Sequence, residues 1–358
     1  MSGIHARLRV RHADFSLDVD LRLPGTGVTA LFGPSGCGKT TCLRAVAGLE
    51  RTEGRVQVNG ETWQDSAAGQ WLPTHRRALG YVFQEASLFP HLNVRRNMEY
   101  GLRRQPPARR QVSLEQAVEL LGLGALLSRM PHTLSGGERQ RVAMARALAV
   151  SPRVLLMDEP LAALDPERKA EVMPYLERLH RTLDIPVLYV SHSPDEVARL
   201  ASHLVLLKNG RVVEQGAPAA LMARLDLPFA HGDAAAALVE ARVTAHDARD
   251  HLLTAQFGGG LLRLVSTRAR TVGESVRLRI PARDVSIALA RAQGSSILNL
   301  LPARITALAE DSPGQVLVRL DAGGTVLLAR ITRHSCTELG LAEGQAVWAQ
   351  VKGVALVD

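Results

Sequence analysis

The chain has 358 residues, of which 46% are hydrophobic and 22% are charged, a composition typical of a globular protein of about two to three domains. No run approaches the ~18 apolar residues that a membrane-spanning helix needs, and the N-terminal segment lacks the apolar stretch of a secretory signal. The net charge of +8 is accompanied by only 4% aromatic residues, so we expect no stacking surface for nucleic acid. The three cysteines predict neither a disulfide framework nor a metal cluster. We therefore expect a protein of the reducing cytoplasm.

Residues 1–230 alternate short apolar runs with helical segments, which is the pattern of an α/β, doubly wound sheet. Two early runs, 7–10 and 15–21, predict an antiparallel strand pair beside this sheet. The strands expected in the sheet itself are 28–32, 81–83, 154–157, 187–190 and 204–207. Helices are expected to follow Lys39, Gly137, Pro166 and Pro194.

A phosphate-binding loop is predicted at 33–40, where Gly-Pro-Ser-Gly-Cys-Gly-Lys-Thr lies between a strand and a helix. This is a complete GxxxxGK[ST] motif in its expected context. Its glycines allow backbone N–H groups to turn toward one anion, and the helix N-terminus adds a positive dipole. Lys39 would place its charge on the β- and γ-phosphates, and the Thr40 hydroxyl suits Mg²⁺. The residues predicted to bind nucleotide here are Gly33, Ser35, Gly36, Cys37, Gly38, Lys39, Thr40 and Thr41.

Two adjacent carboxylates, Asp158 and Glu159, end the apolar strand predicted at 154–157. The carboxyl ends of strands are where an open α/β sheet places its ligand chemistry. Asp158 is predicted to hold Mg²⁺ through water, and Glu159 to polarise the attacking water as general base. An acidic pair that only caps the strand is the structural alternative, and it leaves Lys39 unexplained.

Residues 134–141, Leu-Ser-Gly-Gly-Glu-Arg-Gln-Arg, are similar to the signature sequence of ABC transporter ATPases. Gln84, at the end of a predicted strand, resembles the Q-loop glutamine of that family. The segment 163–165, Ala-Leu-Asp, resembles the D-loop, and His192 resembles the switch histidine. Without the other motifs, a lone glutamine or histidine would more often be structural. The resemblance covers residues 1–230 with the motifs in the family's order.

This resemblance implies catalytic roles for Gln84 and His192, with Gln84 also reaching Mg²⁺ and Asp165 lying close to the nucleotide. In this family an aromatic side chain from the N-terminal strands stacks on adenine. Phe15 is our candidate for that role, and His12 is the alternative.

The resemblance also implies a head-to-tail homodimer, in which Ser135 and Gly137 of one subunit close over the ATP held by the other. Both residues lie where a helix is predicted to begin, so they offer a second helix N-terminus to phosphate. Residues 88–92 follow Gln84 as they do in bacterial importers, where this stretch faces the permease. The implied partners are integral membrane permease subunits, and the implied location is the cytoplasmic face of the inner membrane.

Cys37 is predicted to be reactive because a position at a helix N-terminus lowers the pKa of a thiol. We expect thiol reagents to inactivate the protein and MgATP to protect it. The alternative is a loop position that tolerates many small residues, which predicts full activity for Cys37→Ser.

Beyond residue 230 the sequence changes, after a linker at 231–237, to short strands broken by Gly and Asp. Ala-Arg-Val-Thr-Ala at 241–245 is repeated as Ala-Arg-Ile-Thr-Ala at 303–307. Self-similarity at a fixed period predicts two related small β-barrels, and chance similarity is the alternative. The predicted domains are an ABC ATPase domain at 1–230, a linker with a first, degenerate barrel copy at 231–293, and a second barrel at 294–358.

Residues 294–358 resemble the small molybdate-binding β-barrel called the Mop domain, mainly through Ile-Thr-x-x-Ser-x-x-x-Leu-Gly-Leu at 331–341. The whole chain is then similar to the ATPase subunit of a molybdate or tungstate ABC importer, with ATP and Mg²⁺ at its site. The resemblance adds a periplasmic oxyanion-binding protein as an indirect partner. The first barrel copy lacks the Ile-Thr-x-x-Ser segment, so it is expected to be structural.

An oxyanion in this barrel would depend on backbone N–H groups and hydroxyls, because residues 294–358 carry five basic and six acidic side chains. The candidate ligands are Ser296, Ser335 and Lys352, with Lys352 supplying the charge. A barrel that only stabilises or dimerises the chain is the alternative.

Other transport substrates and other functions stay open at this point. ABC importers of iron, sulfate, sugar or polyamine also carry C-terminal barrels, which usually lack the 331–341 pattern. A non-transport ABC ATPase would need a coiled-coil insertion or a second cassette, and a molybdate-responsive regulator would need a DNA-reading helix-turn-helix. The sequence contains none of these.

Overall fold

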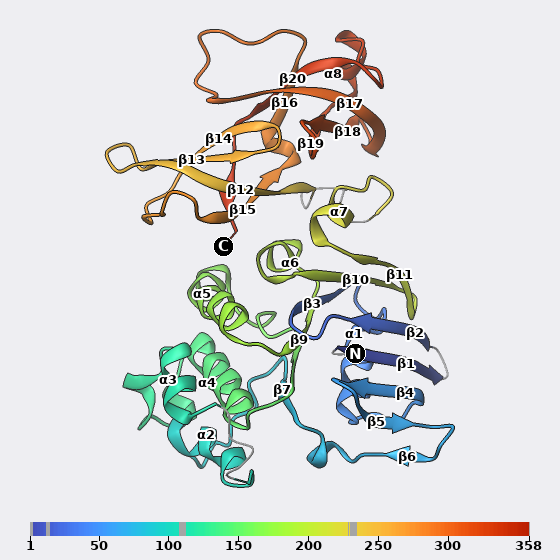
Figure 1. Ribbon diagram of the computed structural model, residues 1–358, viewed down its shortest axis with the longest axis vertical. Helices are drawn as coiled ribbons and strands as arrows, with labels where there is room; N and C mark the ends of the chain where they lie inside the picture. The colour runs from blue at the N-terminus through green and yellow to red at the C-terminus, as the bar shows by residue number, and fades with distance from the viewer. Residues whose placement is uncertain (1–2, 12–14, 107–111, 228, 230–234, 358) are drawn as a thin grey trace. The chain divides into compact units, whose positions relative to one another are not determined.

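The computed structural model describes residues 3–11, 15–106, 112–227, 229 and 235–357 (Figure 1). By its internal contacts the chain divides into two compact units, Met1–Gly216 and Ala217–Asp358. The first unit is mixed α/β, and sheets dominate the second, as expected. The domain limits expected at 230 and 293 remain predictions.

The first unit contains a mostly parallel sheet with the order β11-β10-β3-β9-β8-β7, in which only β11 is antiparallel to its neighbour. These strands are β3 (Gly27–Phe32), β7 (Leu79–Val82), β8 (Val154–Asp158), β9 (Pro186–Ser191), β10 (His203–Lys208) and β11 (Arg211–Gly216). Strands β8 and β9 are buried on both faces, which explains their unbroken apolar sequences. Every strand expected in this sheet is present.

A second, antiparallel sheet has the order β2-β1-β4-β5-β6. Its strands are β1 (Ile4–Arg11), β2 (Ser16–Leu23), β4 (Glu53–Val58), β5 (Glu61–Asp65) and β6 (Gln70–Trp71). The pairing of β1 with β2 confirms the early strand pair expected from the sequence. Alternation of apolar and polar residues along β2 buries one face and exposes the other.

Helix α1 (Lys39–Ala47) shares one apolar core with both sheets, including Leu43 of α1, Leu8 of β1 and Leu156 of β8. The neighbours of Leu156 in β8, Leu155 and Met157, join a different core with the remaining helices, because successive strand residues face opposite sides. These helices are α2 (Val94–Leu102), α3 (Leu114–Leu120), α4 (Gly136–Ala149), α5 (Pro166–Thr182) and α6 (Pro194–Leu200). One face of the parallel sheet therefore packs with α1 and the antiparallel sheet, and the other face packs with the remaining helices.

The second unit contains two antiparallel sheets, with orders β14-β13-β12-β15-β21 and β16-β20-β17-β18-β19. Its elements are α7 (Pro218–Met222), β12 (Ala236–Asp247), β13 (Leu252–Phe257), β14 (Gly260–Val265), β15 (Ser275–Pro281), β16 (Val285–Ala288), β17 (Asn299–Ser312), β18 (Gln315–Ala322), β19 (Thr325–Thr332), α8 (Arg333–Glu338), β20 (Ala346–Val351) and β21 (Ala355–Leu356). Because β12 begins at Ala236, the end of the expected 231–237 linker belongs to a strand.

The two sheets exchange strands. β16, which follows the strands of the first copy in the chain, pairs with β20 of the second copy. β21, at the end of the chain, pairs with β15 of the first copy. One apolar core draws residues from both sheets, among them Val239, Leu278, Leu301 and Leu320. The two copies therefore form one packed body.

The internal repeat is confirmed at the level of individual hydrogen bonds. β12 has a bulge between Val243 and Ala245, and β17 has one between Ile305 and Ala307. The threonine inside each bulge donates to a carbonyl of the neighbouring strand at 3.2 Å: Thr244 to Thr254, and Thr306 to Arg319. Bulges are specific features of a sheet, so the same bulge with the same threonine contact argues against chance similarity.

No helix within the described residues combines the length and the apolar character that crossing a membrane requires.

Candidate functional site

The phosphate loop joins β3 to α1. Lys39 is 4% exposed, and its ammonium donates hydrogen bonds to the carbonyl oxygens of Gly33 (2.8 Å) and Pro34 (2.9 Å). Gly36 and Gly38 have φ angles of 77° and 105°, which residues with a Cβ rarely adopt. The loop therefore places a buried cation beside the N-terminus of α1, where the helix dipole also favours an anion.

The remaining predicted loop residues differ in exposure. Ser35 and Thr40 are exposed, and Thr41 is half-buried in the first turn of α1. Phe15 lies against the loop, since a Cβ built on Gly38 would be 2.8 Å from Cζ of Phe15. This position beside the phosphate loop keeps Phe15 as the candidate for adenine contact, and its rival His12 lies outside the described residues.

Thr40 and Asp158 meet at the carboxyl end of β8. The Thr40 hydroxyl donates to Oδ1 of Asp158 (2.8 Å), and the Tyr81 hydroxyl donates to Oδ2 (3.2 Å). Burial raises the pKa of Asp158, and the two hydrogen bonds oppose that rise. A hydroxyl and a carboxylate oxygen are a suitable donor set for Mg²⁺, which usually takes one or two protein ligands beside waters and phosphates. The residues present therefore fit that ion.

Glu159 follows Asp158 in a left-handed conformation, with φ of 44°. Its backbone N–H donates to the carbonyl of Val190 in β9 (3.1 Å). Nδ1 of His192 lies 3.2 Å from Oε2 of Glu159, and the Glu159 side chain is 20% exposed. Sparsely populated backbone conformations occur often at active sites. Here the turn gives the two adjacent acids different partners, Thr40 for Asp158 and His192 for Glu159.

The predicted signature segment begins α4 as expected. Ser135 is the N-cap: its hydroxyl accepts from the Glu138 backbone N–H (3.2 Å), and its own N–H donates to Oε2 of Glu138 (2.7 Å). This capping box fixes the start of the helix, with Gly137 buried in the first turn. Asp165 is likewise the N-cap of α5, accepting from the Arg168 N–H (2.9 Å). Roles of these residues toward a nucleotide remain predictions.

Gln84 is exposed just beyond β7, and the loop that follows it is held by two helices. The amide of Asn97 on α2 accepts from the Phe89 N–H (2.8 Å) and donates to the carbonyls of Phe89 (3.1 Å) and Leu92 (2.7 Å). Arg146 on α4 donates to the carbonyl of Ser87 (2.9 Å). The segment expected to face a permease therefore has a defined shape.

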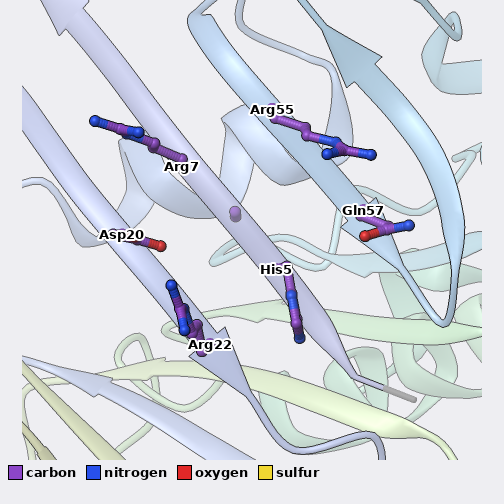
Figure 2. A pocket seen from close by; sticks show the side chains of 7 residues that line it. His5, Arg7, Asp20, Arg22, Arg55 and Gln57 are labelled. Carbon is purple, nitrogen blue, oxygen red and sulfur yellow. The ribbon is translucent and has the colours of Figure 1, made fainter. Parts of the chain in front are cut away.

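A pocket of about 330 Å³ lies on the outer face of the antiparallel sheet. It is lined by His5, Ala6, Arg7, Asp20, Arg22, Arg55 and Gln57. Figure 2 shows Arg7 and Arg55 pointing to opposite sides. The guanidinium groups of Arg7 and Arg55 therefore do not converge on one point.

The three candidate oxyanion ligands lie on different parts of the second barrel copy. Ser296 is exposed in the loop before β17, and Lys352 is exposed just after β20. The Ser335 hydroxyl lies 2.7 Å from that of Thr332, the N-cap of α8. Among the described residues, no hydrogen bond joins the three candidates to one another. Between β14 and β15 of the first copy, the described residues contain no helix at the place of α8.

Two family models match different parts of the chain. Residues 17–162 match the family model of the ABC transporter, and residues 295–357 match that of the TOBE domain. The molybdenum import ATP-binding protein ModC 1 of Azotobacter vinelandii is 63% identical over 357 residues, which are 99% of each chain. This chain belongs to the ATP-binding proteins of the ABC transporter family.

One further relative and one solved structure extend this result to the full length and to the fold. The molybdenum import ATP-binding protein ModC of Methylococcus capsulatus is 58% identical, covering 100% of both chains. The structure of cbiO1 from Clostridium perfringens, part of the ABC transporter complex cbiONQ, matches with a TM-score of 0.53 and 27% identity. It covers 62% of this chain and 91% of its own.

The expectation of a reactive Cys37 in this ABC ATPase is wrong. Cys37 is 5% exposed and belongs to the core around α1. Its sulfur packs against the backbone of Gly33, since a Cβ added to Gly33 would lie only 2.7 Å from the Cys37 Sγ atom. Burial raises the pKa of the Cys37 thiol despite the opposing charge of Lys39, because removing water disfavours the thiolate.

We therefore expect iodoacetamide to alkylate Cys37 at least about ten-fold more slowly than the partly exposed Cys336 at neutral pH, because a thiolate and access are both needed for attack. Peptide mass spectrometry over a time course measures both rates in one sample. Cys37→Ser should retain ATP hydrolysis. Modification of Cys37 as fast as Cys336, with matching loss of activity, would contradict the expectation.

Tyr81 is the residue of this site that the sequence did not reveal. It occupies a predicted strand, where an aromatic residue ordinarily indicates packing. Only the parallel pairing of β7 with β8 brings its hydroxyl to Asp158. Burial and the neighbouring Asp158 raise the pKa of Tyr81, so the phenol is a hydrogen-bond donor at neutral pH.

Proposed function

We propose that this chain hydrolyses ATP to drive the uptake of molybdate, or of the similar anion tungstate, through a membrane permease. The observation that carries the proposal is similarity from end to end: 63% identity over 99% of the chain to a molybdenum import ATP-binding protein. Similarity limited to the nucleotide domain would support only ATP hydrolysis. The match instead includes residues 217–358, which contain the two C-terminal barrel copies.

The nucleotide site assigns a task to each residue. The phosphate loop and Lys39 bind the β- and γ-phosphates, which removes freedom of movement from the reacting group. Thr40 and Asp158 would hold Mg²⁺, which supplies charge neutralisation to the phosphates. Glu159 accepts a proton from the attacking water, and His192 orients the Glu159 carboxylate through the contact at 3.2 Å. In this proposal, Gln84 is a further ligand of Mg²⁺.

The proposal includes a homodimer at the cytoplasmic face of the inner membrane. The capped start of α4, with Ser135 and Gly137, would face the ATP of the partner subunit and contribute a second helix N-terminus. The ordered loop at 88–92 would meet the permease, and a periplasmic oxyanion-binding protein would deliver the substrate. Hydrolysis then removes the ligand that holds the dimer closed, which is a switch in quaternary structure.

The substrate assignment is tested in a bacterial strain whose own molybdate-importer ATPase has been deleted. We expect this chain, expressed with its permease and binding protein, to restore cellular molybdenum at nanomolar external molybdate, as measured by mass spectrometry of the metal. Glu159→Gln should not restore it. If sulfate, iron, sugar or polyamine uptake is restored and molybdenum is not, the assignment is wrong and the alternative substrate is identified.

We also propose that the second barrel copy binds the oxyanion through Ser296, Ser335 and Lys352. Because these residues lie on separate parts of the copy, the site would need donors from a second barrel. Calorimetry on the full chain should detect molybdate and tungstate, and sulfate far more weakly because its shorter bonds do not reach the same donors. Ser335→Ala and Lys352→Ala should each cost about 1–3 kcal/mol of binding. The exposed Ser312→Ala is the matched control, and absence of heat at millimolar molybdate would leave the barrel structural.

A further inference from the structure

A buried carboxylate is hydrogen-bonded to the segment that carries His192. Glu196 is on α6, and its side chain is 7% exposed. Oε2 of Glu196 accepts hydrogen bonds from the hydroxyls of Tyr189 (2.9 Å) and Ser191 (2.7 Å), both on β9. Oε1 accepts from the ammonium of Lys169 on α5 (3.3 Å). Three elements of the first unit therefore meet at one carboxylate.

This network holds the residues on both sides of His192. The Ser191 hydroxyl, which donates to Glu196, also accepts from the Ser193 backbone N–H (3.0 Å). The Ser193 hydroxyl in turn accepts from the Glu196 backbone N–H (3.4 Å). The backbone around His192 is thus fixed by side chains whose contacts all lead to Glu196. The imidazole itself extends to the carboxylate of Glu159, which follows the last residue of β8.

Stability alone is a weak reason for such an arrangement. Burying a carboxylate costs desolvation free energy, and its ion pair and hydrogen bonds at best compensate for that cost. Apolar residues of similar volume often stabilise a protein as well or better. A fully satisfied buried network does, however, specify one arrangement of the elements that it joins. The arrangement specified here is the position of the His192 loop relative to α5, the helix that Asp165 caps.

We propose that Glu196 and Ser191 are positioning residues for ATP hydrolysis, which hold the His192 loop so that the imidazole stays against Glu159. The proposal rests on the roles of Glu159 and His192 in the proposed function. It does not make Glu196 a catalytic residue, because its carboxylate contacts neither the phosphate loop nor Glu159. It predicts that disturbing Ser191 changes turnover only through His192.

The test variant is Ser191→Ala, which removes one hydroxyl and is milder than any change of the buried Glu196. Loss of a buried hydrogen bond that fixes a catalytic loop should lower kcat about ten-fold and leave the KM for ATP within about two-fold. The matched control is Ser202→Ala, just beyond the other end of α6, where the hydroxyl donates to the Val28 carbonyl (3.1 Å). Thermal unfolding of both variants checks that each is folded.

A double-mutant cycle decides whether the effect acts through His192. In the His192→Ala background, Ser191→Ala should cause no further loss of kcat, because the side chain that it positions is gone. The NMR signals of the His192 imidazole should shift in Ser191→Ala and not in Ser202→Ala. Equal kcat for the Ser191 and Ser202 variants, or an undiminished loss in the His192→Ala background, overturns the inference alone. An unaffected kcat in His192→Ala itself removes the assigned role of His192 and the inference together.

Discussion

Glu159→Gln is expected to lower ATP turnover about 10²-fold or more, because an amide cannot accept the proton of the attacking water. ATP binding should persist, since Lys39, Thr40 and Asp158 are untouched and glutamine has the size of glutamate. The protein should then accumulate as an ATP-bound dimer. Single-turnover hydrolysis, equilibrium ATP binding and size-exclusion chromatography with MgATP measure these three consequences separately.

The control for this prediction is Glu171→Gln, the same chemical change at an exposed position of α5. It should leave turnover, binding and oligomeric state unchanged. Near-normal hydrolysis by purified Glu159→Gln would remove Glu159 from the role of general base. The contact between His192 and Glu159 would then need another explanation.

The second large effect is expected on folding: the fragment 294–358 should show no cooperative unfolding transition, whereas 217–358 should unfold cooperatively. The shorter fragment lacks β16, which pairs with β20, and leaves β21 without its partner β15. It would also expose core residues such as Leu301 and Leu320, which pack in a core shared with the first copy. Lost burial of this kind costs roughly 25 cal/mol for each Å² of apolar surface.

Circular dichroism during thermal and urea unfolding compares the two fragments directly. A sharp transition for 294–358, with the secondary structure expected for its strands, would show that the second copy folds alone. The result also determines how oxyanion binding is measured. Absence of binding by an unfolded 294–358 fragment would say nothing about the intact unit, so the full chain is the proper sample.

Most of the nucleotide site could be predicted from the amino-acid sequence. The phosphate loop, the acidic pair and the start of α4 are each encoded by a few consecutive residues, and their local conformation follows from glycine, capping and strand chemistry. The parallel sheet could likewise be predicted, because its buried strands have continuous apolar sequences bounded by turns. The repeat at 241–245 and 303–307 predicted two related copies, which share the same bulge and threonine contact.

Other features could not be predicted, because they depend on contacts between residues far apart in the chain. Cys37 appeared reactive from its place at a helix N-terminus, but burial against the core around α1 raises its thiol pKa. The strand exchange between the barrel copies joins segments far apart in the chain, β16 with β20 and β21 with β15, so it could not be predicted from local sequence. In the sequence, Tyr81 lies in a predicted strand and Glu196 in a predicted helix, and neither setting indicates a polar partner. Their partners are set by the pairing of β7 with β8 and by the packing of α6 on β9.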